Sequence, residues 1–216
     1  MFLEQAFKEP LYYVAVVLSV MVSISLHELA HGFAAIALGD RTPIETERIT
    51  LNPLVHMGGV SVVALFLVGI AWGSMPISPT RLRGRFGEAI VAVAGPLSNI
   101  LLALISLTAM GFWIRHARAT GGVVDHTSFN GLFVLYIFGT MNVFLAIFNL
   151  LPCPPLDGSH IAANFFPGVA SAMRSTGSNS PAIGLFLVVF FFAGRFLMPA
   201  ATSTTDRYLE IVSGRY

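Results

Sequence analysis

Charged residues are scarce in this chain, and the scarcity limits what kind of protein it can be. Asp, Glu, Lys and Arg together make up 11% of the 216 residues, whereas soluble domains carry about a quarter. The chain has one cysteine, Cys153, which excludes an internal disulfide. The formal net charge is +1 and no block of basic residues is present, so nothing in the composition indicates a nucleic acid partner.

Apolar residues take the place of the missing charges. Hydrophobic residues make up 55% of the chain, 18 of them Phe, and the mean hydropathy is +0.77. This composition is typical of a membrane protein. Apolar runs that reach or approach the roughly 20 residues needed to cross a bilayer fall at 11–38, 88–113, 130–151 and 182–199.

Two further apolar stretches, 60–72 and 160–173, are shorter than a membrane span and are more typical of re-entrant or interfacial segments. We therefore predict an all-α polytopic membrane protein with about 4–6 transmembrane helices and a re-entrant segment around 57–72. No polar segment is long enough for a separate soluble domain. We expect one membrane-embedded domain over 1–216, with its core at about 11–160, C-terminal helices at 160–199 and a short tail at 200–216.

The first apolar run contains the sequence HELAH and lacks a small-residue cleavage site, so we interpret it as a retained helix and not a signal peptide. His27 and His31 are four residues apart, so on a helix both imidazoles lie on one face and can bind a single zinc ion. Glu28 can then act on a water molecule at the open coordination position. A chance match is the alternative. However, a carboxylate within the membrane costs at least about 3 kcal/mol and usually faces a cavity or a partner.

A hydrolytic zinc site has three protein ligands, so a third must come from elsewhere in the chain. Spacing alone leaves seven candidates open: His56, His160, Asp125, His126, Glu45, Glu47 and Asp157. Asp157 follows a run of prolines that ends the apolar run 130–151 and leaves backbone carbonyls without helical partners. Unwound backbone at membrane depth is tolerated at a cavity, which would place Asp157 there. A solvated exit loop is the alternative.

Three motifs, in this order, resemble those of the site-2 protease family of intramembrane zinc metalloproteases. They are HELAH in the first run, AGPLSN at Ala94–Asn99 and NLLPCPPLDG at Asn149–Gly158. RITLNPLVH, at Arg48–His56, also resembles the compact bacterial and archaeal branch without a PDZ domain. The resemblance covers about 20–160. It differs from many relatives in the MGG that follows His56 and in the lack of a lysine in 71–79.

The resemblance implies one Zn²⁺ ion per chain, with His27, His31 and Asp157 as the ligands and Glu28 as the catalytic base. It also implies that Asn149 contacts the substrate backbone or the developing oxyanion.

The resemblance makes Asn99 a further residue that lines the site, and His56 is a candidate to line the same cavity. As a hypothesis, residues 50–79 pair with an unwound substrate strand by edge hydrogen bonding. A passive hydrophobic hairpin is the alternative.

The position of Asp157 depends on whether 60–72 spans the membrane. If it spans, Asp157 emerges on the side opposite the histidines. If it re-enters, as its length favours, Asp157 reaches the same side. The loops on that side contain five arginines, so the positive-inside rule makes it cytoplasmic; they are Arg41, Arg48, Arg81, Arg83 and Arg85.

We therefore expect a multi-pass protein of the cell membrane whose site lies within the bilayer, toward the cytoplasmic side. The expected function is hydrolysis of a peptide bond within or near the transmembrane segment of a membrane protein, as in regulated intramembrane proteolysis. The expected partners are such a substrate and the lipid bilayer. The sequence leaves open whether the protein forms a homo-oligomer. The alternative is a non-proteolytic zinc-binding membrane protein that binds transmembrane helices. A metal transporter would need polar groups at successive depths, whereas here they converge on one level.

Overall fold

The computed structural model describes residues 2–121, 126–166, 168–169 and 181–214, and the regular structure in these ranges is helical. For 126–128 and 181–191 it describes the backbone only. In chain order the elements are η1 (Phe2–Glu4), α1 (Gln5–Lys8), α2 (Pro10–Ala37), α3 (Thr42–Glu45), α4 (Pro53–Val68), η2 (Pro79–Arg81), α5 (Gly87–Ala119), α6 (His126–Asn149), α7 (Asp157–Phe165) and α9 (Pro181–Ser213).

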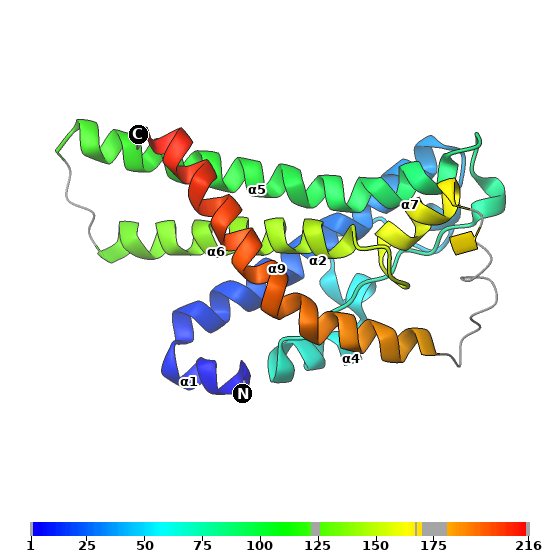
Figure 1. Ribbon diagram of the computed structural model, residues 1–216, viewed down its shortest axis with the longest axis horizontal. Helices are drawn as coiled ribbons and strands as arrows, with labels where there is room; N and C mark the ends of the chain where they lie inside the picture. Colours follow the sequence, from blue (N-terminus) through cyan, green and yellow to red (C-terminus); the bar gives the residue numbers. More distant parts are fainter. Residues whose placement is uncertain (1, 122–125, 167, 170–180, 215–216) are drawn as a thin grey trace.

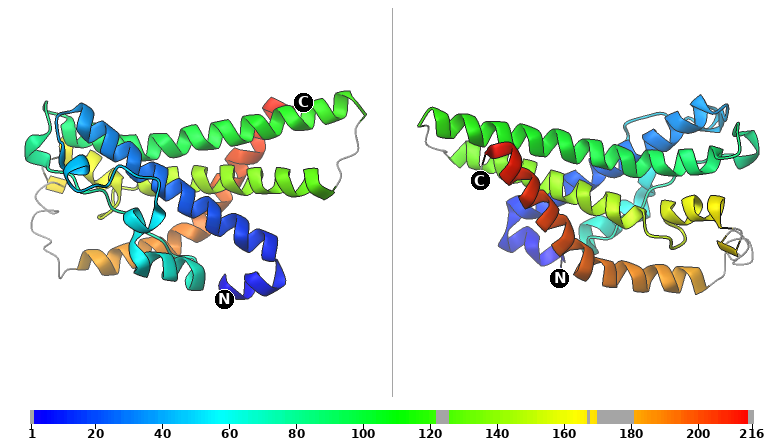
Figure 2. Two further views of the ribbon diagram at one scale, coloured as in Figure 1. Left: turned by 180° about the vertical axis from the view of Figure 1, so that it is seen from behind. Right: turned by 45° about the horizontal axis from the view of Figure 1, so that its top comes forward.

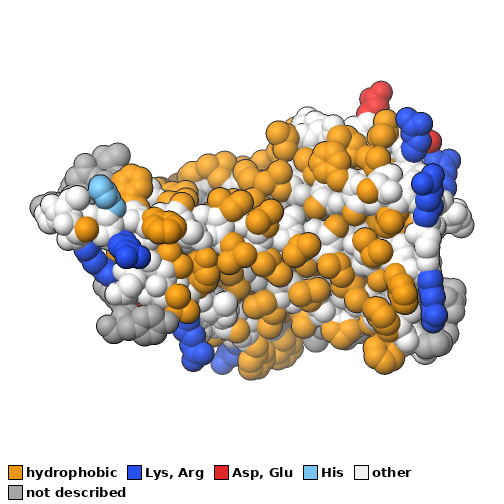
Figure 3. Space-filling model, turned by 90° about the horizontal axis from the view of Figure 1, so that it is seen from above, with side chains coloured by type: hydrophobic (Ala, Val, Ile, Leu, Met, Phe, Trp, Pro, Cys, Tyr) orange, Lys and Arg blue, Asp and Glu red, His pale blue; other side chains and the backbone are white. Residues whose placement is uncertain are grey.

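Helices α2, α5 and α6 form the centre of the molecule and pack against one another (Figure 1). Within the described ranges, these three are the helices whose length and apolar composition suit a membrane span. They confirm the spans predicted over 11–38, 88–113 and 130–151, and α5 continues six residues beyond its predicted end, to Ala119. Apolar side chains cover the middle of the face drawn in Figure 3, and Lys and Arg gather toward its two ends. This distribution suits a protein surrounded by lipid.

Small residues let the long helices approach closely. A Cβ atom added to Gly139 of α6 would lie 2.4 Å from the Leu107 side chain of α5. A Cβ atom added to Gly111 of α5 would lie 2.6 Å from the Val212 side chain of α9. Without a hydrophobic effect between helices in lipid, such close backbone packing is a main source of their association.

Between α2 and α5 the chain leaves the end of the bundle and returns to it. The Arg83 N–H donates to the Leu38 carbonyl at 2.9 Å, so 39–82 is an excursion that closes on itself. On the outward path, α4 packs along α2. Near the end of α4, the Tyr13 hydroxyl of α2 donates to the Phe66 carbonyl at 2.8 Å. The chain therefore returns to the end of the bundle from which it left, which confirms the predicted re-entrant segment (Figure 2).

The chain turns at Gly69, which adopts a left-handed φ of 78°, and returns over 70–78 without regular secondary structure. We call 70–78 the return strand. Two contacts hold it against α4. The Ser74 N–H donates to the His56 carbonyl at 3.0 Å, and the Ser61 hydroxyl bonds both the N–H and the carbonyl of Trp72. The outward helix and the return strand thus form one hairpin.

Helix α6 ends at Asn149, and a proline-containing turn leads into α7, which packs against α5. Gly158 makes this turn possible, because a Cβ atom there would lie 2.2 Å from the Leu150 carbonyl oxygen. Asp157 is the first residue of α7. Because α5 runs away from the end of α2 and α6 runs back, Asp157 reaches the end of the bundle that holds the C-terminal half of α2 (Figure 1).

The last helix is longer than the sequence suggested. Helix α9 extends to Ser213, so most of the segment expected as a short tail, 200–216, is helical. The reason is packing: Ala201, Thr205 and Leu209 are buried at helical spacing against the bundle. The Thr108 and Tyr208 hydroxyls lie 2.7 Å apart, which joins this part of α9 to the C-terminal half of α5.

Candidate active site

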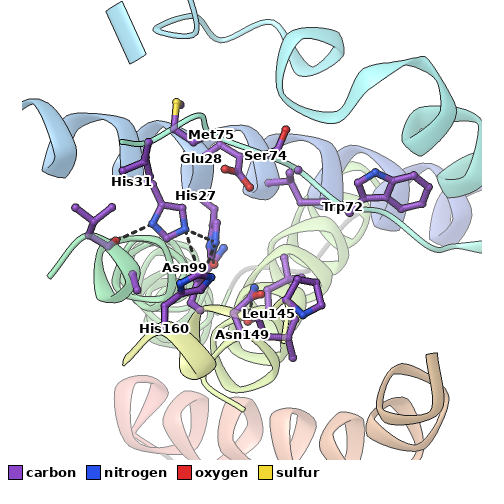
Figure 4. Close-up of a pocket in the computed structure, with 18 of the residues that line it drawn as sticks. His27, Glu28, His31, Trp72, Ser74, Met75, Asn99, Leu145, Asn149 and His160 are labelled. Carbon is purple, nitrogen blue, oxygen red and sulfur yellow. Dashed lines mark hydrogen bonds and ion pairs between the residues drawn. The ribbon is translucent and has the colours of Figure 1, made fainter. Parts of the chain in front are cut away.

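The two histidines of HELAH lie on adjacent turns of α2 and are both buried. Their Nε2 atoms are 2.9 Å apart (Figure 4). The Nδ1 atom of His31 lies 2.7 Å from the Val91 carbonyl oxygen of α5. A carbonyl oxygen can only accept, so His31 Nδ1 carries the proton and its Nε2 keeps a lone pair toward the cavity. The Nδ1 atom of His27 lies 2.7 Å from Asn99 Oδ1.

Asp157 approaches both imidazoles from α7. Its Oδ2 atom is 3.1 Å from His27 Nε2, and its Oδ1 atom is 3.3 Å from His31 Nε2. The three potential ligand atoms lie within 4.8 Å of one another. The spacing of four residues in α2 and the return of α6 thus bring together the group expected from the sequence.

This donor group fits a metal ion. Asp157 Oδ2 is buried and no hydrogen bond from the described residues satisfies it. Lone pairs on two neutral imidazoles and a carboxylate, turned toward one another in a buried site, repel unless a cation lies between them. Two imidazoles and one carboxylate are also the protein ligands of many catalytic zinc sites.

Gly95 of α5 gives the imidazoles their space. A Cβ atom at this position would lie 2.4 Å from His31 Nε2 and 2.5 Å from His27 Nε2. Only a residue without a side chain lets α5 pass this close to the two Nε2 atoms. Gly95 lies within the AGPLSN motif identified from the sequence. The space that it leaves for the imidazoles depends on how α5 crosses α2, which the spacing of residues in the sequence does not reveal.

We expect Gly95→Ala to weaken zinc binding by at least about tenfold, the scale seen when the support of a metal ligand is lost. The added methyl group must displace one imidazole or move α5. Zinc bound per folded protein, measured after dialysis against a weak chelator, checks this. Gly111→Ala is the matched control, because it also creates a close contact in α5 but lies about 24 Å along the helix. Equal zinc loss in both variants would show a general packing defect.

Glu28 is buried beside the histidines. Its carboxylate lies against the return strand, since a Cβ atom at Gly73 would be 2.5 Å from Glu28 Oε1. The side chain therefore sits between α2 and the hairpin, on the edge of the cavity (Figure 4).

A cavity of about 480 Å³ opens beside these residues. Helices α2, α5, α6 and α7 and the return strand all contribute to its wall. Both predicted asparagines, Asn99 and Asn149, line it, and Asn149 Nδ2 donates to the Leu145 carbonyl at 3.0 Å. His160 also lines it and is exposed.

The remaining ligand candidates lie elsewhere. His56 is buried in the hairpin, does not line the cavity, and places Nε2 2.6 Å from the Thr50 carbonyl oxygen. Its role toward the substrate stays a prediction. Glu45, the last residue of α3, and Glu47, in the turn that follows, are both exposed. Asp125 lies outside the described residues, as does the side chain of His126.

Asp40 holds the end of the return strand at Ser78. This residue was not identified from the sequence. Its buried carboxylate accepts from the Ser78 N–H at 2.7 Å and from the Thr42 N–H at 2.9 Å. Burial raises the pKa of Asp40, but the hydrogen bonds from Thr42 and Ser78 outweigh it and hold the pKa below its usual value. The carboxylate is therefore ionised at neutral pH, and it keeps the strand beside Glu28.

Comparison with known proteins agrees with this geometry. The family model described as Peptidase family M50 matches 15–192, which includes Glu28 and all three members of the donor group. YwhC of Bacillus subtilis is 32% identical over 207 residues, covering 91% of this chain and 90% of the relative. Rip2 of Mycolicibacterium smegmatis is 31% identical, covering 69% and 58%. Both carry the name "Putative zinc metalloprotease".

A zinc metalloprotease of Methanocaldococcus jannaschii is 26% identical, covering 77% of this chain and 38% of the relative. No solved structure matches the chain. The family match spans most of the chain, and the motifs that suggested the family lie where α2, α5 and α7 meet. The chain therefore belongs to peptidase family M50, the site-2 protease family, and is a metallopeptidase.

Proposed function

We propose that this protein is an intramembrane zinc metalloprotease that cleaves within or near the transmembrane segment of a membrane protein, in regulated intramembrane proteolysis. One observation carries the proposal: Asp157 meets the paired imidazoles at a buried point beside Glu28. A carboxylate that does not bind the ion can act as the general base for a water molecule at the open coordination position.

The proposed chemistry assigns a role to each polar group. Zinc, when held by His27, His31 and Asp157, supplies Lewis-acid activation of water and of the scissile carbonyl. Glu28 takes a proton from the attacking water and passes it to the leaving amine. Asn149 uses one N–H on the Leu145 carbonyl, so its second N–H is available to the oxyanion of the tetrahedral intermediate.

The return strand is proposed to hold the substrate in extended form. The N–H groups of Trp72 and Ser74 point toward α4, where both are hydrogen-bonded. Gly73 and Met75 alternate with these two residues along the chain, and all four residues line the cavity. Among the described residues nothing bonds the Gly73 and Met75 N–H groups. An unwound substrate segment could pair there.

The proposed location is the cell membrane, in a multi-pass arrangement with the site toward the cytoplasm. The positive-inside rule supports this orientation. The described arginines at the end of the bundle that holds the site are Arg41, Arg48, Arg81, Arg83 and Arg85. The described Lys and Arg residues toward the other end are fewer by one: Lys8 of α1, Arg115 and Arg118 near the end of α5, and Arg207 in the C-terminal part of α9.

Incubation of the purified protein with a single-span membrane substrate, with and without a chelator, tests the function. We expect cleavage that stops with the chelator and returns when zinc is added. Cleavage that continues without metal would contradict the proposal. Metal-dependent capture of the substrate with no cleavage would instead indicate the non-proteolytic zinc-binding protein.

A further inference from the structure

Two buried asparagines join His27 to the backbone of a third helix. Asn99 of α5 and Asn142 of α6 are both completely buried. Asn99 Oδ1 lies 2.7 Å from His27 Nδ1, and Asn99 Nδ2 donates to Asn142 Oδ1 at 2.9 Å. Asn142 Nδ2 in turn donates to the Phe138 carbonyl at 2.9 Å. Figure 4 shows Asn99 next to His27, on the side away from Glu28.

The backbone carbonyl sets the direction of every bond in this chain. The Phe138 carbonyl can only accept, so the amide nitrogen of Asn142 faces it and the oxygen faces Asn99. Asn99 must then present its nitrogen to Asn142 and its oxygen to His27. An amide oxygen also only accepts, so His27 Nδ1 carries the proton and Nε2 keeps its lone pair.

His31 reaches the same state by a shorter route, because its Nδ1 faces the Val91 carbonyl directly. If Asn142 could not accept, the Asn99 amide would be free to turn over and present its NH₂ group to His27. His27 would then favour the proton on Nε2, where it blocks metal binding. The amide direction of Asn99 is therefore a condition for His27 to serve as a ligand.

We propose that Asn142 is a positioning residue for the metal site: through Asn99 it holds His27 with Nε2 available to the ion. The inference rests on the zinc site of the proposed function and not on proteolysis. Partners of a metal-ligating histidine typically change metal affinity by 10–100-fold when they are removed. Asn142 stands one residue further away, so we expect an effect at the lower end of this range.

The test measures the zinc dissociation constant in detergent by competition with a chromogenic chelator. Asn142→Leu keeps similar bulk but removes both hydrogen bonds, and we expect the dissociation constant to rise about tenfold. Ser106→Ala is the matched control. It removes a buried hydrogen bond, from Ser106 to the Ala103 carbonyl, that involves neither asparagine, and should leave zinc affinity unchanged. An unchanged affinity in Asn142→Leu would overturn the inference, and a native protein that binds no zinc would overturn the proposed function as well.

A double-mutant cycle separates action through Asn99 from a general structural role. In an Asn99→Leu background, Asn142→Leu should cause no further loss of zinc affinity. An equal loss in both backgrounds would show that Asn142 supports the fold only.

A second variant keeps the inference testable if Asn142→Leu lowers the unfolding temperature of the metal-free protein. Asn142→Asp, in its neutral form, still accepts from Asn99 Nδ2 and donates its O–H to the Phe138 carbonyl, so its zinc affinity should stay near the native value. A tenfold loss in Asn142→Asp would contradict the relay.

Discussion

Glu28→Gln is expected to lower the rate of peptide cleavage by about 10²–10⁴-fold while zinc stays bound. The amide cannot take the proton of the attacking water, but it has nearly the same size and lies outside the group of three potential ligands. Cleavage of a single-span substrate and zinc per folded protein, measured on the same preparation, check both parts of this expectation.

Glu88 provides the control for Glu28. It is a second glutamate on the wall of the same cavity, at the first turn of α5, and it is exposed. Glu88→Gln should keep most of the activity, because a solvated carboxylate is not held against the scissile bond. Native turnover in Glu28→Gln would rule out its role as the base, and a loss confined to Glu88→Gln would move that role to Glu88.

Asp157→Asn is expected to cost more zinc affinity than any change outside the ligand group, so more than the 10–100-fold typical of supporting residues. The substitution removes the only negative charge among the three potential ligands and leaves two imidazoles. Activity should fall together with zinc content, which mass spectrometry of the folded protein and a cleavage assay measure side by side.

His160 is the alternative third ligand that this experiment examines. It lies three residues after Asp157, lines the same cavity and is exposed. We expect His160→Ala to keep its zinc. Unchanged metal content in Asp157→Asn, combined with loss in His160→Ala, would assign the third position to His160.

The features that the sequence predicted are those with a local signal. The spans of α2, α5 and α6 follow from the length of apolar runs, and the pairing of His27 with His31 follows from a spacing of four. The re-entry of the segment after α2 followed from its shortness, and it decided on which side Asp157 would lie. Each of these is set by residues close together in the chain.

The features that escaped prediction depend on contacts between distant helices. Asn142 is a polar residue in an apolar run, but the sequence does not indicate its partner, which is 43 residues away on another helix. The space that Gly95 leaves for two imidazoles depends on the crossing of α2 and α5. Asp40 resembles any polar residue after a helix until Ser78, 38 residues later, is seen to donate to it.

The closure of the excursion at Leu38 and Arg83 has a consequence for how relatives of this protein can diverge. The excursion over 39–82 starts and ends at the same end of the bundle. Its length can therefore change without reversing the orientation of any later helix. Insertions, deletions or exchanges between these two points would change the cavity wall that the return strand forms, while His27, His31 and Asp157 keep their depth in the bundle. This part of the cavity wall can therefore vary without moving the three potential ligands.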